Sequence, residues 1–144
     1  IRGCEVFGAA DKGIKVTTGS HARIESSWVH DNLNGGIQAA LGGHVEAFDN
    51  LVENNRGATA QNGIAVLGAD DNGGEVSFSE LDARGNVSRR NGANGLAVRV
   101  GASARVRDNY LAVNGSAGIR VFNDAGPAAT AMVEGTSAAC NGTD

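Results

Sequence analysis

The chain has little of what usually fills a globular core or bends a backbone. Its 144 residues include four Phe, one Tyr, one Trp and a single proline, Pro127. A core with so few aromatic side chains has to be packed with small aliphatic ones, which Ala, Val and Ile supply here. Hydrophobic residues make up 41% of the chain, a nearly ordinary share that does not indicate disorder.

Long apolar runs and basic clusters are absent as well. No run approaches the roughly 20 apolar residues of a transmembrane helix, so we expect no membrane insertion. The formal net charge is −4, and the 12 basic residues are scattered, with Arg89 and Arg90 as the one tight pair. A nucleic-acid partner would need a concentrated basic surface, so none is expected.

Cysteine and histidine are few, and they follow no metal-ligand spacing. The two cysteines, Cys4 and Cys140, stand at opposite ends of the chain, and no C-x-x-C pattern occurs. The three histidines, His21, His30 and His44, do not form a ligand motif either. We therefore expect no metal site and no cofactor from these residues.

Glycine is abundant instead, and it marks a repeat. The chain has 22 Gly, about twice the usual share of roughly 7%. A Gly followed by a branched apolar residue, a variable residue and a small apolar residue occurs at 13–16, 36–39, 63–66, 95–98 and 118–121. The spacings between successive copies are 23, 27, 32 and 23 residues, so a unit of about 23 residues recurs with two insertions.

A second signal precedes the later copies: two Asn five residues apart. The pairs are Asn50 and Asn55, Asn86 and Asn91, and Asn109 and Asn114; Ser27 and Asn32 and also Thr136 and Asn141 fit the same frame, and Cys4 falls at its first position. Apolar residues alternate before each pair. Such period-two stretches predict short strands, and the Gly, Asn and Asp between them predict turns.

These patterns predict an all-β solenoid: a parallel β-helix of about five to six coils, forming one domain over residues 1–144. Each coil has room for three short strands and three turns, and equivalent strands should stack about 4.8 Å apart. One inward column is expected to contain Ile14, Ile37, Ile64, Leu96 and Ile119, and the next Val16, Ala39, Val66, Val98 and Val121. The Asn column should form a side-chain amide ladder at a turn, where Asn tolerates a left-handed backbone.

The two insertions are expected around residues 56–61 and within 68–81. Insertions in solenoids project from one face, which is often the binding face. Asp70, Asp71 and Asn72 in the second insertion could bind a hard cation such as Ca²⁺, although an Asp/Asn run flanked by Gly is more often a turn.

The frame Asn-x4-Asn-x3-Gly-Ile-x-Val, clearest from Asn109 to Val121, resembles the right-handed parallel β-helix repeat of the pectate-lyase-like superfamily. The resemblance extends from about Cys4 to Asn141 and implies right-handed coiling. That superfamily includes polysaccharide lyases, glycoside hydrolases, sugar epimerases, phage tailspikes and adhesins, so the resemblance implies no single activity. The catalytic strings of its enzymes are not found here, and no catalytic residue is assigned.

Outward positions of the second strand of each coil should stack into two charged columns. One contains Arg23, Glu46, Asp82 and Arg105, and the other Glu25, Phe48, Arg84 and Arg107. Arg84, Arg105 and Arg107 could bind the carboxylates of an acidic glycan bidentately. Alternatively, this is an ordinary solvated face on which Arg23 pairs with Glu46 and Asp82 with Arg105.

Two further sets of residues could either form part of a functional site or only stabilise the fold. One predicted column contains His30, Glu53 and Arg89, and the column beside it contains Asp31, Asn54 and Arg90. The first three could act in acid–base chemistry, or they could simply be the polar residues of a turn region. Trp28 could be a sugar platform or a cover for its corner, where Leu51 and Tyr110 take equivalent slots.

Two covalent modifications are not expected. Asn86, Asn114 and Asn141 match the N-glycosylation pattern, but ladder positions should be inaccessible. Cys4 and Cys140 should lie about five coils apart, roughly 24 Å, which is too far for a disulfide.

Two functions therefore remain open. The first is a structural or glycan-binding segment of a longer, secreted or cell-surface protein; the coils run to both ends of the chain, which also allows end-to-end self-association. The second is a carbohydrate-active enzyme, resembling a polysaccharide lyase, that acts on an acidic polysaccharide.

Overall fold

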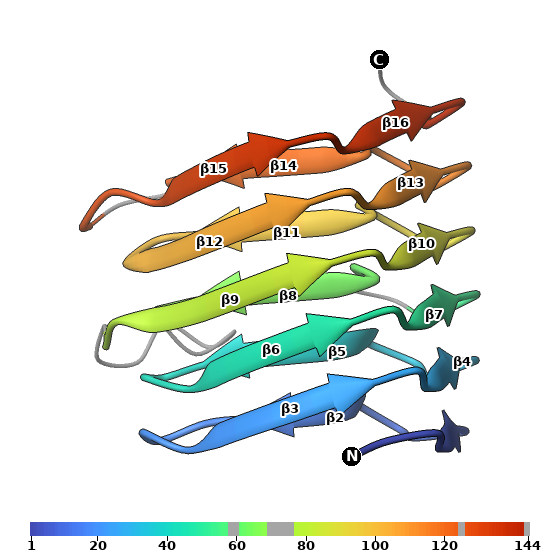
Figure 1. Cartoon of the computed structure of the whole chain (residues 1–144), viewed down its shortest axis with the longest axis horizontal. Coiled ribbons are helices and arrows are strands. Elements are labelled where there is room, and N and C mark those ends of the chain that lie inside the picture. The colour runs from blue at the N-terminus through green and yellow to red at the C-terminus, as the bar shows by residue number, and fades with distance from the viewer. Residues whose placement is uncertain (58–60, 69–76, 124–125, 143–144) are drawn as a thin grey trace.

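The computed structural model describes residues 1–57, 61–68, 77–123 and 126–142. These residues form sixteen β-strands, and no helix long and apolar enough to cross a membrane occurs among them. The strands belong to three sheets, here called sheets 1, 2 and 3 in the order in which the chain visits them. Successive strands enter sheets 1, 2 and 3 in turn, so three strands complete one coil (Figure 1).

The bounds of the strands follow the same order in every sheet. Sheet 1 contains β1 (Glu5–Phe7), β4 (Trp28–His30), β7 (Leu51–Glu53), β10 (Val87–Arg89), β13 (Tyr110–Ala112) and β16 (Ser137–Ala139). Sheet 2 contains β2 (Lys12–Val16), β5 (Gly35–Ala40), β8 (Ile64–Leu67), β11 (Leu96–Arg99) and β14 (Ile119–Phe122). Sheet 3 contains β3 (His21–Glu25), β6 (His44–Phe48), β9 (Ser79–Arg84), β12 (Ala102–Arg107) and β15 (Thr130–Glu134).

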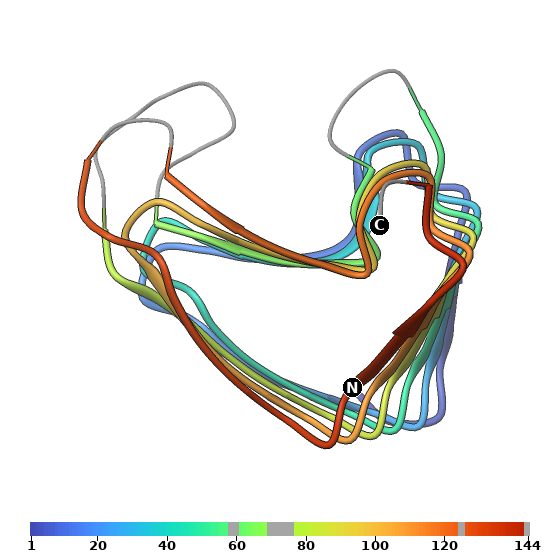
Figure 2. The same cartoon turned by 90° about the horizontal axis from the view of Figure 1, so that it is seen from above.

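Every pairing between neighbouring strands is parallel, and the coils stack in one direction. Five complete coils run from β1 to β15, and β16 opens a sixth, which confirms the predicted number. Seen from above in Figure 2, the described parts of the coils superimpose as a three-sided outline, one side for each sheet. The chain is therefore the parallel β-helix that its repeat predicted.

The predicted inward columns form the core. Ile14, Ile37, Ile64, Leu96 and Ile119 lie side by side in sheet 2, and the column from Val16 to Val121 follows two residues later. The first four members of the first column are buried, and Ile119 is partly buried. Full burial of such a side chain contributes about 1.5–3 kcal/mol, so the aliphatic columns supply the cohesion that aromatic residues usually provide.

The last complete coil leaves core positions uncovered. Val121 of β14 and Val133 of β15 point toward the interior columns, yet they are 45% and 47% exposed. No described strand stacks on the far side of β14 or β15, and a solenoid covers each coil only with its neighbours.

Each repeat has Gly before its branched apolar residue because a side chain does not fit there. At Gly95, an added Cβ would lie 2.7 Å from the Nδ2 atom of Asn114 and 2.8 Å from the carbonyl oxygen of Gly118. Both atoms belong to the next coil, so Gly at this position lets the coils approach closely.

The Asn residues of the repeat form two ladders that run along the stack of coils. The first ladder, between sheets 3 and 1, contains Ser27, Asn50, Asn86, Asn109 and Thr136. The second, between sheets 1 and 2, contains Asn32, Asn55, Asn91, Asn114 and Asn141. All ten positions except Thr136 are buried.

One rung illustrates the bonding. Asn86 donates from Nδ2 to Asn109 Oδ1 at 2.9 Å and to the carbonyl oxygen of Ala47 at 2.8 Å. Its own Oδ1 accepts from the backbone N–H and from Nδ2 of Asn50, both at 3.0 Å. The buried amide is therefore fully bonded, but only because a coil lies on each side of it.

The left-handed backbone lies one residue earlier than expected. The ladder residues themselves are not left-handed; the residues directly before them are, at φ values between 47° and 67° for Ser26, Asp49, Gly85, Asp108 and Gly135 in the first ladder. The second ladder repeats this arrangement, and even Val113 takes φ 57° before Asn114. The preceding residue makes the sharp corner, which leaves the Asn free to aim its amide along the stack.

The insertions lie where the spacings predicted, with one boundary moved. The links from β7 to β8 and from β8 to β9 are the long ones. The second link ends before Ser79, where β9 begins, so residues 79–81 belong to a strand rather than to the insertion. Asp70, Asp71 and Asn72 lie outside the described residues, and the Ca²⁺ expectation stays a prediction.

A central rung should dominate stability. Replacing Asn86 with Ala removes four buried side-chain hydrogen bonds. We expect a loss of about 2–4 kcal/mol in the free energy of unfolding. Asn86→Ser should lose less, because Ser27 already fills the equivalent slot and accepts from the N–H of Cys4 at 3.2 Å. Urea unfolding followed by circular dichroism measures both.

Asn34→Ala is the matched control, because the Asn34 side chain makes one long bond of 3.5 Å to Asp11. If Asn86→Ala unfolds at the same urea concentration as Asn34→Ala, the ladder does not hold the coils together.

Candidate functional site

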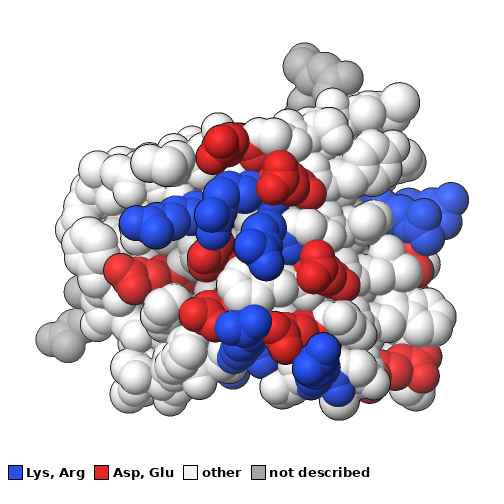
Figure 3. Space-filling view, in the orientation of Figure 1, with Lys and Arg blue, Asp and Glu red and all other residues white. Residues whose placement is uncertain are grey.

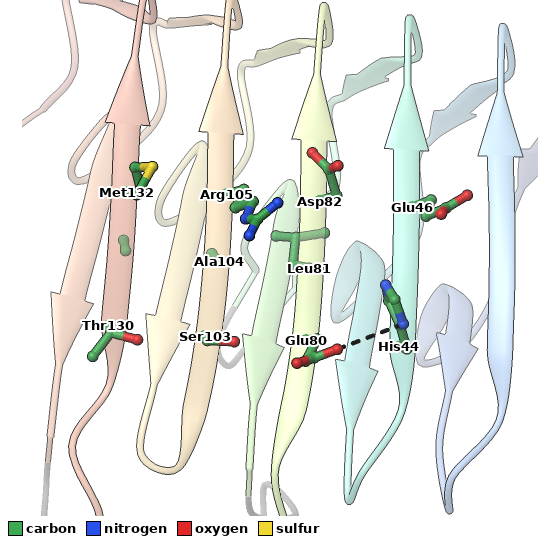
Figure 4. Close-up of a pocket in the computed structure, with 11 residues that line it drawn as sticks. His44, Glu46, Glu80, Leu81, Asp82, Ser103, Ala104, Arg105, Thr130 and Met132 are labelled. Atoms are coloured by element: carbon green, nitrogen blue, oxygen red, sulfur yellow. Dashed lines mark ion pairs between the residues drawn. The ribbon is translucent and has the colours of Figure 1, made fainter.

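An open groove lies across the outer face of sheet 3, from coil two to coil five. It has a volume of about 660 Å³. Figure 4 shows its side chains projecting from four neighbouring strands. The groove is lined by His44 and Glu46 of β6, Glu80, Leu81 and Asp82 of β9, Ser103, Ala104 and Arg105 of β12, and Thr130, Ala131 and Met132 of β15.

The two predicted charge columns occur on this face in the predicted register. Arg23, Glu46, Asp82 and Arg105 are direct neighbours along one column, and Glu25, Phe48, Arg84 and Arg107 along the other. Figure 3 shows basic and acidic side chains intermixed over the face, rather than a patch of one sign. The strands of sheet 3 are parallel and stack in register, so residues at equivalent positions of successive coils become direct neighbours. This stacking produces both columns.

The ion pairs differ in part from those expected. Arg23 pairs with Glu46 at 3.6 Å, as predicted, and also with Glu25. Asp82, however, pairs with Arg107 at 3.2 Å and not with its direct neighbour Arg105. A long Arg side chain reaches a diagonal partner as easily as the residue opposite, so strand register alone does not decide the pairing.

The three arginines expected to bind a glycan are therefore not equivalent. Arg105 lines the groove and makes no hydrogen bond or ion pair with any residue that the structure describes. Arg107 is held by Asp82, and the guanidinium of Arg84 stacks over the ring of Phe48 at 5.3 Å. Arg105 is the one whose guanidinium is available inside the groove.

Two histidines and a glutamate gather at the coil-one end of the same face. His21 and His44 are direct neighbours on β3 and β6, with ring centroids 4.6 Å apart. One potential ligand atom from each of His21, His44 and Glu46 lies within 4.8 Å of the others. The sequence predicted no metal site because its histidines follow no ligand motif along the chain. These two histidines are one coil apart in the sequence, and only the stacking of the coils brings them together.

A smaller groove of about 340 Å³ lies on the outer face of sheet 2. Arg120 stacks over Phe122 at 4.4 Å, and Arg99 lies 5.5 Å from the same ring. Ala65, Leu67 and Ala97 form a buried apolar floor. None of these residues was predicted from the sequence as part of a site.

The column of His30, Glu53 and Arg89 on sheet 1 occurs as predicted, but its groups bond to one another. Glu53 accepts from Arg89 Nε at 2.7 Å and from Trp28 Nε1 at 3.1 Å. His30 stacks against Trp28 at 3.9 Å, and Trp28 lies in the same column as Leu51 and Tyr110, as expected. These contacts tie neighbouring coils together and favour a structural role.

Both ring nitrogens of His30 face carboxylates. Nδ1 lies 2.6 Å from Asp31 Oδ2, and Nε2 lies 3.0 Å from Glu5 Oε1. Burial by itself lowers the pKa of His30, but the bonds to Asp31 and Glu5 outweigh it and raise the pKa above its ordinary value. The protonated ring is therefore favoured in the folded protein.

The family model for the right-handed β-helix region matches residues 1–79, more than half of the chain. The chain belongs to the right-handed β-helix family. Searches of curated proteins and of solved structures returned no match.

The family match covers the first two coils of this β-helix and the third as far as the start of β9. It includes His21, His44 and Glu46, whereas Arg105 lies beyond it on β12. The same strand order and register continue through the later coils, so the whole described chain follows one architecture.

The β-helix also decides which modification sites are accessible. Asn86, Asn114 and Asn141 are buried in the ladders, where their amides are hydrogen-bonded, as expected for ladder positions that are inaccessible. Cys4 and Cys140 are both free and exposed, one in the first coil and one in the last. No disulfide joins them, as the coil spacing predicted.

The raised pKa of His30 has a consequence for stability. The protonated ring contributes stability that is fully present below the unfolded-state value of about 6.5 and is lost as the pH rises through the higher folded-state pKa. NMR titration of the ring protons should report a pKa above 6.5, and Asp31→Asn should lower it.

Asp49→Asn removes the same charge at the equivalent left-handed position of the other corner and serves as the control. A His30 pKa that moves equally in both variants would contradict a specific contact with Asp31.

Proposed function

We propose that this β-helix segment binds an acidic glycan along the outer face of sheet 3. The observation that carries the proposal is the guanidinium of Arg105 inside the groove, which has no hydrogen-bond or ion-pair partner among the described residues. Of the carboxylates that line the groove, Glu46 pairs with Arg23 and Asp82 pairs with Arg107. Glu80 faces His44, with Oε2 3.7 Å from Nδ1 (Figure 4). A carboxylate or sulfate on a sugar would give Arg105 the partner that the described chain does not supply.

The other lining residues suit the hydroxyl-rich body of a sugar. Ser103 of β12 and Thr130 of β15 are direct neighbours in the column two residues before that of Arg105, and both offer hydroxyl groups. The carboxylates of Glu80 and Asp82 can accept hydrogen bonds from sugar hydroxyls. Met132 is 66% exposed beside Arg105 and offers an apolar surface to the face of a sugar ring.

The orientation of the groove supports a linear polymer. The groove runs across the strands, parallel to the stacking axis, where equivalent positions recur about every 4.8 Å. A chain of sugars can lie across several coils and contact one coil after another. Arg84 and Arg107 lie in the neighbouring column, where they would flank the polymer rather than hold its central charge.

The proposal also implies a location and a role. Acidic polysaccharides are polymers of the cell exterior, so we place the protein outside the cell or at its surface. The role proposed is binding by a rigid, elongated module. Turnover by a lyase, hydrolase or epimerase in the same groove is the alternative, and the binding experiment distinguishes it.

Arg105→Ala should weaken binding to polygalacturonate, alginate or heparin by roughly 10–100-fold, because a hydrogen-bonded ion pair to the guanidinium is lost. Arg105→Lys should recover part of the affinity, since it keeps the charge but not the bidentate geometry. Calorimetry or glycan-array binding measures both, with an uncharged glucan as the reference polymer.

Arg120→Ala, on the outer face of sheet 2, is the matched control and should bind as the unaltered protein does. Binding that is unaffected by Arg105→Ala, or no binding to any acidic polymer, would overturn the proposal. Release of unsaturated uronate or of shorter sugars during incubation would instead identify an enzyme.

A further inference from the structure

His21, His44 and Glu46 converge where β3 lies beside β6. From their geometry we infer that these three side chains form a binding site for a transition-metal ion of the Zn²⁺ class. His21 and His44 are opposite each other in the parallel ladder, and Glu46 follows His44 on the same face of β6. Nε2 of His21 lies 3.9 Å from Oε1 of Glu46, and one ligand atom of each residue lies within 4.8 Å of the others.

These separations are close to those of a bound site. Ligand atoms around a tetrahedral Zn²⁺, at bonds of about 2.0–2.2 Å, lie about 3.3–3.6 Å apart. The side chains of His21 and His44 are 55% and 41% exposed, so small rotations about their side-chain torsions bring the nitrogens to that distance. The strands themselves need not move.

The donor set selects the class of ion. Two imidazoles and one carboxylate suit Zn²⁺, Co²⁺, Ni²⁺ or Cu²⁺, whereas Ca²⁺ and Mg²⁺ prefer oxygen ligands alone. Three protein ligands leave one tetrahedral position open to solvent, because the site lies on an exposed face. A water molecule or a ligand oxygen would occupy that position.

Two neighbouring residues would orient the ligands. Glu80 lies 3.7 Å from Nδ1 of His44, so its carboxylate can accept that N–H while Nε2 binds the ion. Arg23 Nη1 lies 3.6 Å from Oε2 of Glu46, which leaves Oε1 facing His21. Carboxylate-to-histidine contacts of this kind are the usual outer partners of metal-binding imidazoles.

Metal binding at this site does not require glycan binding. It shares His44 and Glu46 with the end of the sheet 3 groove, but it does not use Arg105. A protein that binds no glycan can still bind the metal, so the two proposals fail separately.

Zn²⁺ titration of the chelator-treated protein, in competition with a chromophoric chelator, tests the inference. We expect one ion per chain. His21→Gln and His44→Gln should each abolish detectable stoichiometric binding, and Glu80→Gln should weaken it by roughly 10–100-fold. Co²⁺ should give the intense visible absorption of a four-coordinate ion, which the two histidine variants lose.

Two control variants show whether the ion binds elsewhere on the chain. The exposed thiols of Cys4 and Cys140 could bind Zn²⁺ themselves, so the titration is repeated with both changed to Ser, and the affinity should not change. Glu134→Gln removes an acidic group from the same sheet on β15 and should bind as the unaltered protein does. Less than one bound ion per chain, or binding that survives His44→Gln, would overturn the inference.

Discussion

Side-chain amides stacked between coils hold this β-helix in register, and most other features of the chain depend on them. Each central Asn bonds to the coil above and to the coil below, as Asn86 does with Asn109 and Asn50. A slip of the strands by one residue would leave buried amide groups without hydrogen-bond partners. The free-energy cost of such an unsatisfied buried group exceeds the net stabilisation from a single hydrogen bond. The left-handed residue before each Asn and the Gly before each branched residue are the backbone conditions for this alignment.

This constraint confines chemistry to the outward positions of the strands. Inward positions are filled by aliphatic columns, and two of the three corners are occupied by the ladders. What remains is a set of outer faces on which residues one coil apart in the chain become direct neighbours. His21 and His44, 23 residues apart, meet on sheet 3 for that reason.

Electrostatic pairing on these faces is less regular than the backbone. Each column contains charges of both signs, so partners are available on the same strand or on an adjacent one. The choice of partner depends on side-chain reach: Asp82 bonds to Arg107 diagonally, and Arg105 is left available in the groove. Cross-strand pairs of this kind are individually weak, so small differences in geometry decide between them.

The sequence by itself determined the coil length, the strand order, both inward columns and an Asn ladder at a turn, because stacking demands the same kind of residue at the same spacing in every coil. It also predicted the two charge columns on sheet 3 and the column of His30, Glu53 and Arg89. Only the tertiary structure decided that Asp82 pairs with Arg107, that Arg105 faces the groove without a partner among the described residues, and that Glu46 joins the two histidines. Register follows from a repeating pattern, whereas these contacts depend on rotamers and on the reach of individual side chains, which no repeat encodes.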